Sequence, residues 1–437
     1  MAKYKIYTYG CQMNVHESEK LAGILNEMGY TSTEIDEEAD IILFNTCCIR
    51  ENAEQRLMGN VGALKPLKKK KKDLIVAVGG CMTEQNNVAN KLVETFPFID
   101  IVFGTHNLTL FKEYLLERLN GKKHIIKVHT DDGSLPKEVT PLRTSYPNAW
   151  VNIIYGCNNF CTYCIVPYVR GRERSRDKDE IISEVKHLVE SGYKEITLLG
   201  QNVDSYGVGL PYEYDFADLL EDISKIEGKF RIRFMSNHPK DITEKVVKVI
   251  KNSDKICNYI HLPLQSGSSR ILKLMNRHYT FESYYEKVQM IKKHLPISSI
   301  STDIMVGFPS ETEEDFADTM KMASLVRFDG AFTFIYSRRK GTRADLMDEQ
   351  IPEEIKKERI VKLIDLQNSI NREKSLEYKN KIVEVLCEDF DTKKNLYLGR
   401  DELNRMIYFE SEKDIIGEFV SVKITETGGI SLYGELV

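Results

Sequence analysis

Three closely spaced cysteines in the middle of the chain constrain its fold and chemistry more than any other feature. They are Cys157, Cys161 and Cys164, spaced C-x3-C-x2-C, and they follow a β-rich run at 149–155 that predicts a strand. Cysteine thiolates can hold a four-iron iron–sulfur cluster, which has four cysteine ligands when only the protein binds it. Three thiolates would therefore leave one iron open to a small molecule. The alternative is a zinc site. Structural zinc takes four Cys or His ligands, and the next such residue, His187, lies within a predicted helix.

A second set of cysteines is spread over the first part of the chain. Cys11, Cys47 and Cys81 each come directly after an apolar run that predicts a buried strand, and predicted helices separate these runs. Such a pattern is typical of an open parallel α/β sheet, in which the carboxyl ends of the strands share one edge where ligands bind. The three thiols are therefore predicted to converge on a second cluster, although a single cysteine is often only a small buried hydrophobe. Cys48 is the rival of Cys47 as a ligand.

Residues 149 to about 340 alternate between strand and helix patterns. Six such repeats predict a partial (β/α)6 barrel, whose chemistry sits at the carboxyl ends of its strands. The polar or turn-forming residues at those positions are Gln201, Asn202, Ser236, His238, Pro263, Gln265, Ser266 and Gly307.

The last sixty residues have a different pattern. A predicted helix at 351–378 is followed by five short alternating runs separated by turns. This pattern predicts a small β-barrel of the oligonucleotide-binding kind. The segment carries more acidic than basic side chains, so any phosphate contact must use a few cations gathered on one face.

The totals exclude several classes of protein. A chain of 437 residues is expected to form two to three domains, and no apolar run approaches the roughly 20 residues that a membrane span needs. The start of the chain lacks a signal-peptide pattern, so we expect a cytoplasmic protein with no membrane partner. Nine cysteines in such a chain favour metal binding or catalysis over disulfides.

The run GCNNFCTYCIVPYVRG resembles the radical S-adenosylmethionine (SAM) superfamily and, within it, the methylthiotransferases. The resemblance implies that Cys157, Cys161 and Cys164 hold a [4Fe-4S] cluster that binds SAM. It also implies that Cys11, Cys47 and Cys81 hold an auxiliary [4Fe-4S] cluster, with Cys47 matching the family's N-T-C. The last barrel resembles the TRAM domain, through GR at 399–400 and NR at 404–405.

The resemblance also divides the chain and assigns its cofactor contacts. It implies an N-terminal methylthiotransferase domain at 1–120, a linker at 121–142, a radical SAM core at 143–373 and a TRAM domain at 375–437. Two SAM molecules are consumed per turnover. The residues expected to border SAM are Tyr163, Gly200, Gln201, Asn202, Ser236, Gln265 and Gly307. Arg233 is expected either to reach the SAM carboxylate or to be structural, and Arg277 is expected to have a role near the substrate or cofactor.

The family resemblance implies an enzyme that adds a methylthio group to C2 of N6-(dimethylallyl)adenosine next to the anticodon of tRNA. The runs NTCCIRENA and GRERSR favour this branch, and some of the arginines at 170–176 are expected to contact RNA. We expect a monomer that takes electrons from a donor such as flavodoxin or ferredoxin. One alternative is the branch that acts on N6-threonylcarbamoyladenosine in tRNA. An alternative of a different class is a non-catalytic iron–sulfur or zinc protein that binds RNA.

Overall fold

The computed structural model describes residues 1–48, 51–85, 87–128, 134–135 and 139–437. Parts of the predicted linker, 129–133 and 136–138, lie outside the described residues, as do Ile49 and Arg50 of the NTCCIRENA run. The chain forms two compact units. The first comprises Met1–Thr144, Tyr155–Asn158 and Ile165–Arg174, and the second comprises Ser145–Ile154, Asn159–Cys164 and Ser175–Val437.

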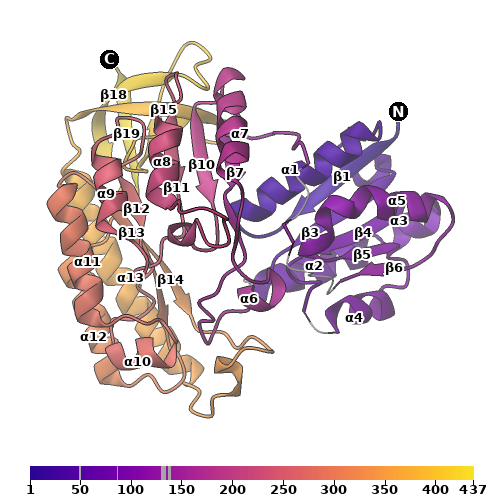
Figure 1. Ribbon diagram of the computed structural model, residues 1–437, viewed down its shortest axis with the longest axis horizontal. Coiled ribbons are helices and arrows are strands. Elements are labelled where there is room, and N and C mark those ends of the chain that lie inside the picture. Colours follow the sequence, from indigo (N-terminus) through magenta and orange to yellow (C-terminus); the bar gives the residue numbers. More distant parts are fainter. Residues whose placement is uncertain (49–50, 86, 129–133, 136–138) are drawn as a thin grey trace. The chain divides into compact units, whose positions relative to one another are not determined.

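The first unit is built on a six-stranded parallel sheet with the order β2-β1-β3-β4-β5-β6 (Figure 1). Its strands are β1 (Lys3–Thr8), β2 (Thr31–Ser32), β3 (Ile41–Thr46), β4 (Ile75–Gly80), β5 (Ile101–Phe103) and β6 (Ile125–Lys127). The helices and 3-10 turns are α1 (Gln12–Glu27), η1 (Asp36–Glu38), α2 (Glu51–Ala63), α3 (Lys65–Lys70), α4 (Val88–Thr95), η2 (Thr105–Leu110), α5 (Phe111–Leu119) and α6 (Val166–Val169).

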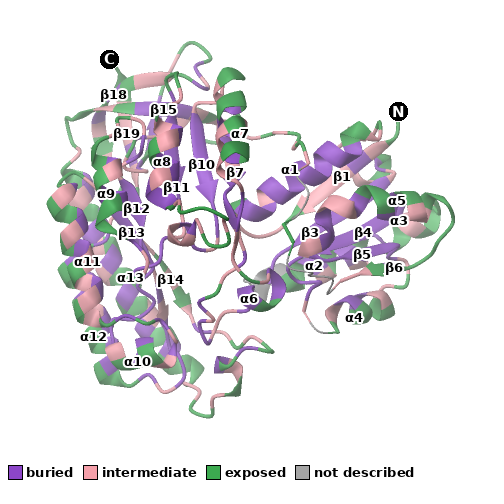
Figure 2. Ribbon diagram, in the orientation of Figure 1, coloured by how far each residue is buried: buried purple, intermediate pink, exposed green. Residues whose placement is uncertain are grey.

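The strands of this sheet are apolar on both faces, because helices cover both. Ile41 and Leu43 pack on the side of α1 and α5, and Ile42 and Phe44 pack on the side of α2 and α4. A parallel sheet covered in this way has continuous apolar strands, and β3 and β4 are buried along their whole length (Figure 2). The predicted open α/β sheet is therefore confirmed.

The second unit begins with a partial barrel of parallel strands. Two three-stranded sheets, β7-β10-β11 and β12-β13-β14, meet where Ile232 of β11 bridges Ile256. The strands are β7 (Asn148–Asn152), β10 (Glu195–Leu199), β11 (Arg231–Phe234), β12 (Tyr259–His261), β13 (Ser299–Val306) and β14 (Gly330–Ile335). Two short strands, β8 (Ile154–Tyr155) and β9 (Arg174–Ser175), form a separate two-stranded sheet.

Helices follow the barrel strands and cover one face of them. They are α7 (Lys178–Glu190), η3 (Val203–Ser205), α8 (Phe216–Ser224), α9 (Glu244–Lys251), α10 (Ser269–Leu274), α11 (Phe281–His294), α12 (Glu313–Val326), η4 (Ala344–Leu346) and α13 (Glu353–Leu376). Capping boxes begin α8 at Asp215, α11 at Thr280 and α12 at Thr312, where the side chain satisfies backbone N–H groups of the first turn. The largest apolar core of the chain lies between these helices and the strands, and the predicted (β/α)6 barrel is confirmed.

The second unit ends in a closed five-stranded barrel of order β15-β16-β17-β19-β18. Its strands are β15 (Ile382–Asp391), β16 (Leu396–Arg400), β17 (Met406–Phe409), β18 (Phe419–Thr427) and β19 (Ser431–Leu436). Val385, Cys387, Ile407 and Phe409 fill its interior. The predicted small β-barrel is therefore confirmed, and within the described residues no helix is long and apolar enough to cross a membrane.

Two local features differ from what the sequence pattern indicates. The segment 121–142, expected to be a linker, contains β6, which extends the sheet beside β5. A run of five lysines such as 68–72 favours a solvated loop, but this run partly forms α3. There Lys68 pairs with Asp100 at 2.9 Å and Lys71 pairs with Asp40 at 2.8 Å, so these charges attach the helix to the ends of neighbouring strands.

Candidate functional site

The three cysteines of the first unit lie at one edge of its sheet. Cys11 follows β1 and is the N-cap residue of α1, Cys47 follows β3, and Cys81 follows β4. Because β1, β3 and β4 are neighbours in a parallel sheet, their carboxyl ends present the three thiols side by side. The two buried strand ends leave Cys47 and Cys81 almost inaccessible to solvent.

The thiols contact one another and the glycines at these turns. A side-chain hydrogen bond joins Cys48 and Cys81. That bond lowers the pKa of Cys81 and, together with burial, raises the pKa of Cys48. Gly10 has a φ of 120°, and a Cβ there would lie 2.7 Å from Cβ of Cys47, so only glycine lets the backbone approach this closely. The structure therefore places Cys48, which sequence reasoning ranked below Cys47, directly against Cys81.

A buried arginine, Arg170, supplies positive charge to this group. Its Nε donates to Sγ of Cys81 at 3.1 Å, and its Nη1 donates to Oε1 of Glu17 at 2.7 Å. Further contacts reach Met13 and Asn14 of α1. The sequence predicts RNA contacts for some of the arginines at 170–176, and Arg170, only 6% exposed, is not one of them. The charge stabilises thiolate at Cys81, which contributes to the lowered pKa of that thiol.

These residues fit an iron–sulfur cluster by the chemistry of their donors. Thiolates are the ligands that such clusters use, and a buried cation offsets the negative charge that thiolates bring into a low-dielectric interior. In the part of the chain that the structure describes, no group of three or more Cys, His, Asp or Glu side chains is placed to hold a single metal ion. A four-iron cluster spaces its thiolates around a cube of atoms rather than around one ion.

The loop that carries the other three cysteines is shared by the two units. Cys157 belongs to the first unit, where its N–H donates to the carbonyl of Gly171 at 3.1 Å. Cys161 and Cys164 belong to the second unit, where the N–H of Cys164 donates to the carbonyl of Cys161 at 2.9 Å. There Nη1 of Arg277 also lies 3.3 Å from Sγ of Cys161, and its Nε donates to the Tyr279 hydroxyl at 3.0 Å. This arginine therefore contacts both a cysteine and a structural partner.

Two of the expected SAM-bordering residues lie on turns with unusual backbone conformations. Gln265 has a φ of 65°. Its N–H donates to the carbonyl of Asp303, and its carbonyl accepts from the N–H of Met305, both at 2.8 Å. Ser236 has a φ of 69°. Non-glycine residues in this region are strained and concentrate at ligand sites, which is consistent with the predicted role of both positions.

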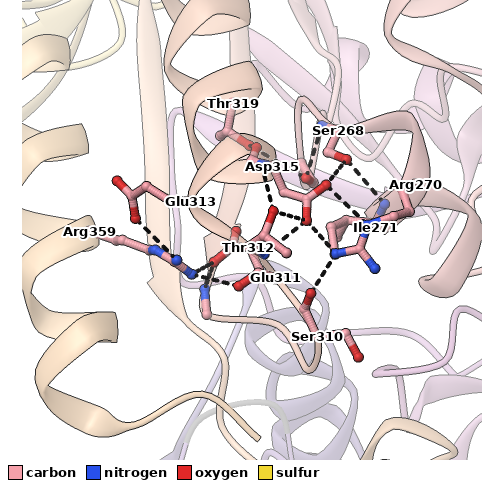
Figure 3. Close-up of polar contacts among 12 residues, drawn as sticks. Ser268, Arg270, Ile271, Ser310, Glu311, Thr312, Glu313, Asp315, Thr319 and Arg359 are labelled. Atoms are coloured by element: carbon pink, nitrogen blue, oxygen red, sulfur yellow. Dashed lines mark hydrogen bonds and ion pairs between the residues drawn. The ribbon is translucent and has the colours of Figure 1, made fainter. Parts of the chain in front are cut away.

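Figure 3 shows a network of charged side chains after β13, which includes Glu311, Asp315 and Arg359. The Gly307 N–H donates to Oε2 of Glu311 at 2.5 Å, and the same oxygen accepts from Nη1 of Arg359 at 2.8 Å. Burial raises the pKa of Glu311. Asp315, at the start of α12, accepts from Ser268 at 2.5 Å and pairs with Arg270. The network thus fixes the turn after β13 and the start of α10 in one arrangement.

The remaining expected cofactor residues have mixed surroundings. Tyr163 packs against an apolar cluster that includes Phe308 and Tyr336. A Cβ at Gly200 would lie 2.4 Å from Cγ2 of Ile154, which explains the glycine by close packing. Gln201 is half-buried, whereas Asn202 is buried and donates to Asp241 at 2.8 Å. That contact gives Asn202 a structural partner in the segment between β11 and α9.

Several arginines have structural rather than ligand-binding contacts. Arg233 forms a two-pronged pair with Glu195, both bonds being 2.9 Å, so the structural alternative holds for it. Arg176 is buried and pairs with Glu184 at 2.8 Å. Sequence reasoning missed Glu17 and Glu311 altogether, because an isolated glutamate in a helix or turn carries no signal of burial.

The chain matches three family models. Residues 3–104 match Uncharacterized protein family UPF0004, residues 151–323 match the Radical SAM superfamily, and residues 376–437 match the TRAM domain. Among solved structures, a radical S-adenosylmethionine methyltransferase, TsrM, from Kitasatospora setae matches with a TM-score of 0.58 at 13% identity. The match covers 79% of this chain and 77% of that one. At this identity the likeness supports the fold alone.

Curated relatives match over nearly the whole chain. A tRNA-2-methylthio-N(6)-dimethylallyladenosine synthase from Thermoanaerobacter pseudethanolicus is 51% identical over 435 residues, covering 99% of this chain and 92% of that protein. One from Clostridium tetani is 52% identical over 433 residues, covering 99% and 96%. The chain therefore belongs to the radical SAM methylthiotransferase family that includes the tRNA-2-methylthio-N(6)-dimethylallyladenosine synthases.

Proposed function

We propose that this protein is an enzyme that adds a methylthio group to C2 of N6-(dimethylallyl)adenosine next to the anticodon of tRNA. The observation that carries the proposal is the family relationship over the whole chain, which includes all three domain models. C2 of adenine bears an unactivated hydrogen that no side chain can remove as a proton at neutral pH. The reaction therefore needs a cofactor, and the protein contributes binding, orientation and exclusion of water.

The protein would carry two [4Fe-4S] clusters and use two SAM molecules per turnover. Cys157, Cys161 and Cys164 would hold the cluster that binds SAM. Cys11, Cys47 and Cys81 would hold the auxiliary cluster, with Arg170 beside them. SAM bound there would supply, on reductive cleavage, the radical needed to remove the C2 hydrogen. The residues proposed to border SAM are Tyr163, Gly200, Gln201, Asn202, Ser236, Gln265 and Gly307.

The chain's own residues position these groups. Arg277 orients Cys161 through its hydrogen bond to that sulfur, and Glu311 fixes the Gly307 N–H. Among the arginines of the loop that follows the cysteines, Arg172 is exposed and is the one we assign to an RNA contact. The target base must leave its stack to react, which a single-stranded anticodon loop permits most easily.

The tRNA substrate argues for the cytoplasm as the site of action. We also propose that the protein is a monomer that takes single electrons from a flavodoxin or ferredoxin. The proposed domain limits are 1–120, 121–142, 143–373 and 375–437, with β6 extending the first sheet into the linker.

The test is an anaerobic assay with three synthetic anticodon stem-loop RNAs, which carry adenosine, N6-(dimethylallyl)adenosine or N6-threonylcarbamoyladenosine. Mass spectrometry of the nucleosides should show a methylthio product from the dimethylallyl RNA alone. A product only from the threonylcarbamoyl RNA would assign the chain to the sibling activity. Protein that contains zinc, with no product from any of the RNAs, would favour a non-catalytic role.

A further inference from the structure

The last strand of the partial barrel, β14, presents two aromatic side chains to the face that the helices do not cover. The register of β13 and β14 pairs Ile304 with Thr333 and Val306 with Ile335, and Ile304, Val306 and Ile335 pack in the core under the helices. Because successive side chains of a strand point to opposite faces, Phe332 and Phe334 lie on the inner face.

Both of these side chains are unusually open for large aromatic residues. Phe332 is 53% exposed and Phe334 is 46% exposed. The two are separated by one residue on the same face, so they form one continuous apolar surface. Isolated apolar residues on a surface need no explanation, but a contiguous apolar surface marks a binding site. β14 is also an edge strand of its sheet, which leaves this surface accessible beside it.

The polar neighbours of this surface are a carboxylate, Asp303, and an imidazole, His261. Asp303 of β13 is paired in register with Phe332 and so lies on the same face. Its Oδ2 is 3.6 Å from Nε2 of His261 of β12. The His261 ring is in edge contact with Phe332, with ring centroids 6.0 Å apart. Its Nδ1 lies 2.9 Å from the Ser301 hydroxyl. The inner face therefore combines an apolar wall with a carboxylate directly beside it.

We propose that Phe332 and Phe334 bind the dimethylallyl group of the target adenosine, and that Asp303 disfavours the threonylcarbamoyl group at the same place. The inference rests on the proposed function, and these three residues determine which modified adenosine the enzyme accepts. The dimethylallyl group is an apolar five-carbon chain without hydrogen-bonding atoms, so it suits exposed phenyl rings that can bury it from water. The threonylcarbamoyl group carries a carboxylate, which Asp303 would repel. Such repulsion is a common source of specificity.

The experiment measures the affinity of the full-length, cluster-containing protein for the three stem-loop RNAs, anaerobically and without SAM. The Phe332→Ala/Phe334→Ala variant should lose roughly tenfold or more of its preference for the dimethylallyl RNA over the unmodified RNA, while its affinity for the unmodified RNA stays the same. Asp303→Asn should bind the threonylcarbamoyl RNA more tightly than the original protein does. The matched control is Leu325→Ala, which removes another exposed apolar side chain, on α12, and should change none of the affinities.

Release of 5′-deoxyadenosine from SAM without RNA checks that each variant is folded and loaded. If the double variant fails this check, Phe332→Leu and Phe334→Leu replace it, and each should lose part of the preference. Equal weakening of all three RNAs, or an unchanged preference, would overturn the inference. Failure of the original protein to modify the dimethylallyl RNA would instead refute the proposed function, so the two failures are distinguishable.

Discussion

At the scale of single residues, Arg170 is the side chain on which the first cysteine group most depends. Burying a guanidinium is costly unless charged partners surround it, and here Glu17 and Cys81 both accept hydrogen bonds from it. Its charge also offsets that of any thiolate introduced at the edge of the sheet. Removing Arg170 would leave Glu17 buried without its cation and the thiols without their donor.

We therefore expect Arg170→Met to impair the auxiliary cluster specifically. Anaerobically purified protein should fall from about eight irons per chain towards about four, while release of 5′-deoxyadenosine from SAM persists. Iron and sulfide analysis with electron paramagnetic resonance measures both clusters. Arg172→Met, which removes an exposed arginine from the same loop, serves as the control, and retention of all the iron in Arg170→Met would contradict the assignment.

The choice between Cys47 and Cys48 can be tested in the same way. Cys161→Ala should abolish SAM cleavage, whereas Cys47→Ala should spare it and block methylthiolation. Because Cys48 hydrogen-bonds with Cys81, Cys48→Ala is the informative comparison, and full iron content in it would leave Cys47 as the ligand. Cys387→Ala, in the interior of the last barrel, is a control that should keep both clusters.

The cysteines could be found from the sequence, because metal-ligating thiols at strand ends leave a pattern in spacing. Their charged partners could not. Arg170 lies far from Glu17 and Cys81 along the chain, and a sequence of alternating arginines is equally consistent with an exposed, RNA-binding loop. Only folding determines which of them becomes buried, as the contrast between Arg170 and Arg172 shows.

At the scale of elements, α13 stabilises the turn at Gly307 through Arg359. Arg359 and Glu311 are both buried. Removing the Arg359 cation would leave the Glu311 carboxylate buried without its ion-pair partner. We expect Arg359→Met to cost roughly 3–5 kcal/mol of unfolding free energy and to raise the SAM concentration needed for half-maximal cleavage. Thermal unfolding and SAM titrations measure the two effects.

Lys357→Met is the matched control for this change, because Lys357 is exposed on the same helix. It should change stability by no more than about 0.5 kcal/mol. If Arg359→Met unfolds at the temperature of the control, the Glu311–Arg359 pair does not stabilise the turn.

Most elements could be predicted because their apolar period was clear. The apolar pattern predicts helices at 178–190 and 281–294, which are the bounds of α7 and α11. It likewise predicts strands with the bounds of β10, β17 and β19. The errors lie where the pattern is short or polar. β6 has only three residues, and α3 consists mainly of lysines. Ion pairs stabilise α3, and the spacing of residues along the chain does not reveal them.

At the scale of the whole molecule, the arginines by which the last barrel resembles a TRAM domain join it to the partial barrel. Arg400 pairs with Glu388 at 2.9 Å and lies 3.6 Å from Glu195 of β10. Arg405 pairs with Asp329 at 2.8 Å. These arginines therefore hold the two barrels together. Because they have this structural role, the excess of acidic residues in the last barrel does not conflict with their presence.

The buried Asp401 at this junction predicts a dependence of stability on pH. Burial raises the pKa of Asp401 to about 6, so the folded chain binds a proton more tightly than the unfolded chain, whose Asp has a pKa of about 3.9. The stabilisation is present below about pH 4 and is lost as the pH rises through about 6.

Relative to Asp401→Asn, the original protein should therefore lose about 3 kcal/mol between these pH values. The asparagine oxygen can still accept from the Arg405 N–H, as Asp401 does at 2.7 Å, so the comparison isolates the proton. Calorimetric unfolding of matched anaerobic samples measures the difference, and a difference that stays constant with pH would refute it.

The first compact unit includes Ile165–Arg174, which follows the first strand of the barrel along the chain. Its sheet is complete by Lys127, yet the cation beside its thiols is encoded some forty residues further on. Expression of residues 1–144 alone would therefore yield a fragment whose cysteines lack their counter-charge. A chimera that exchanges the first unit between two relatives would have to exchange residues 1–144 and Ile165–Arg174 together. The first unit therefore cannot be exchanged as one continuous segment.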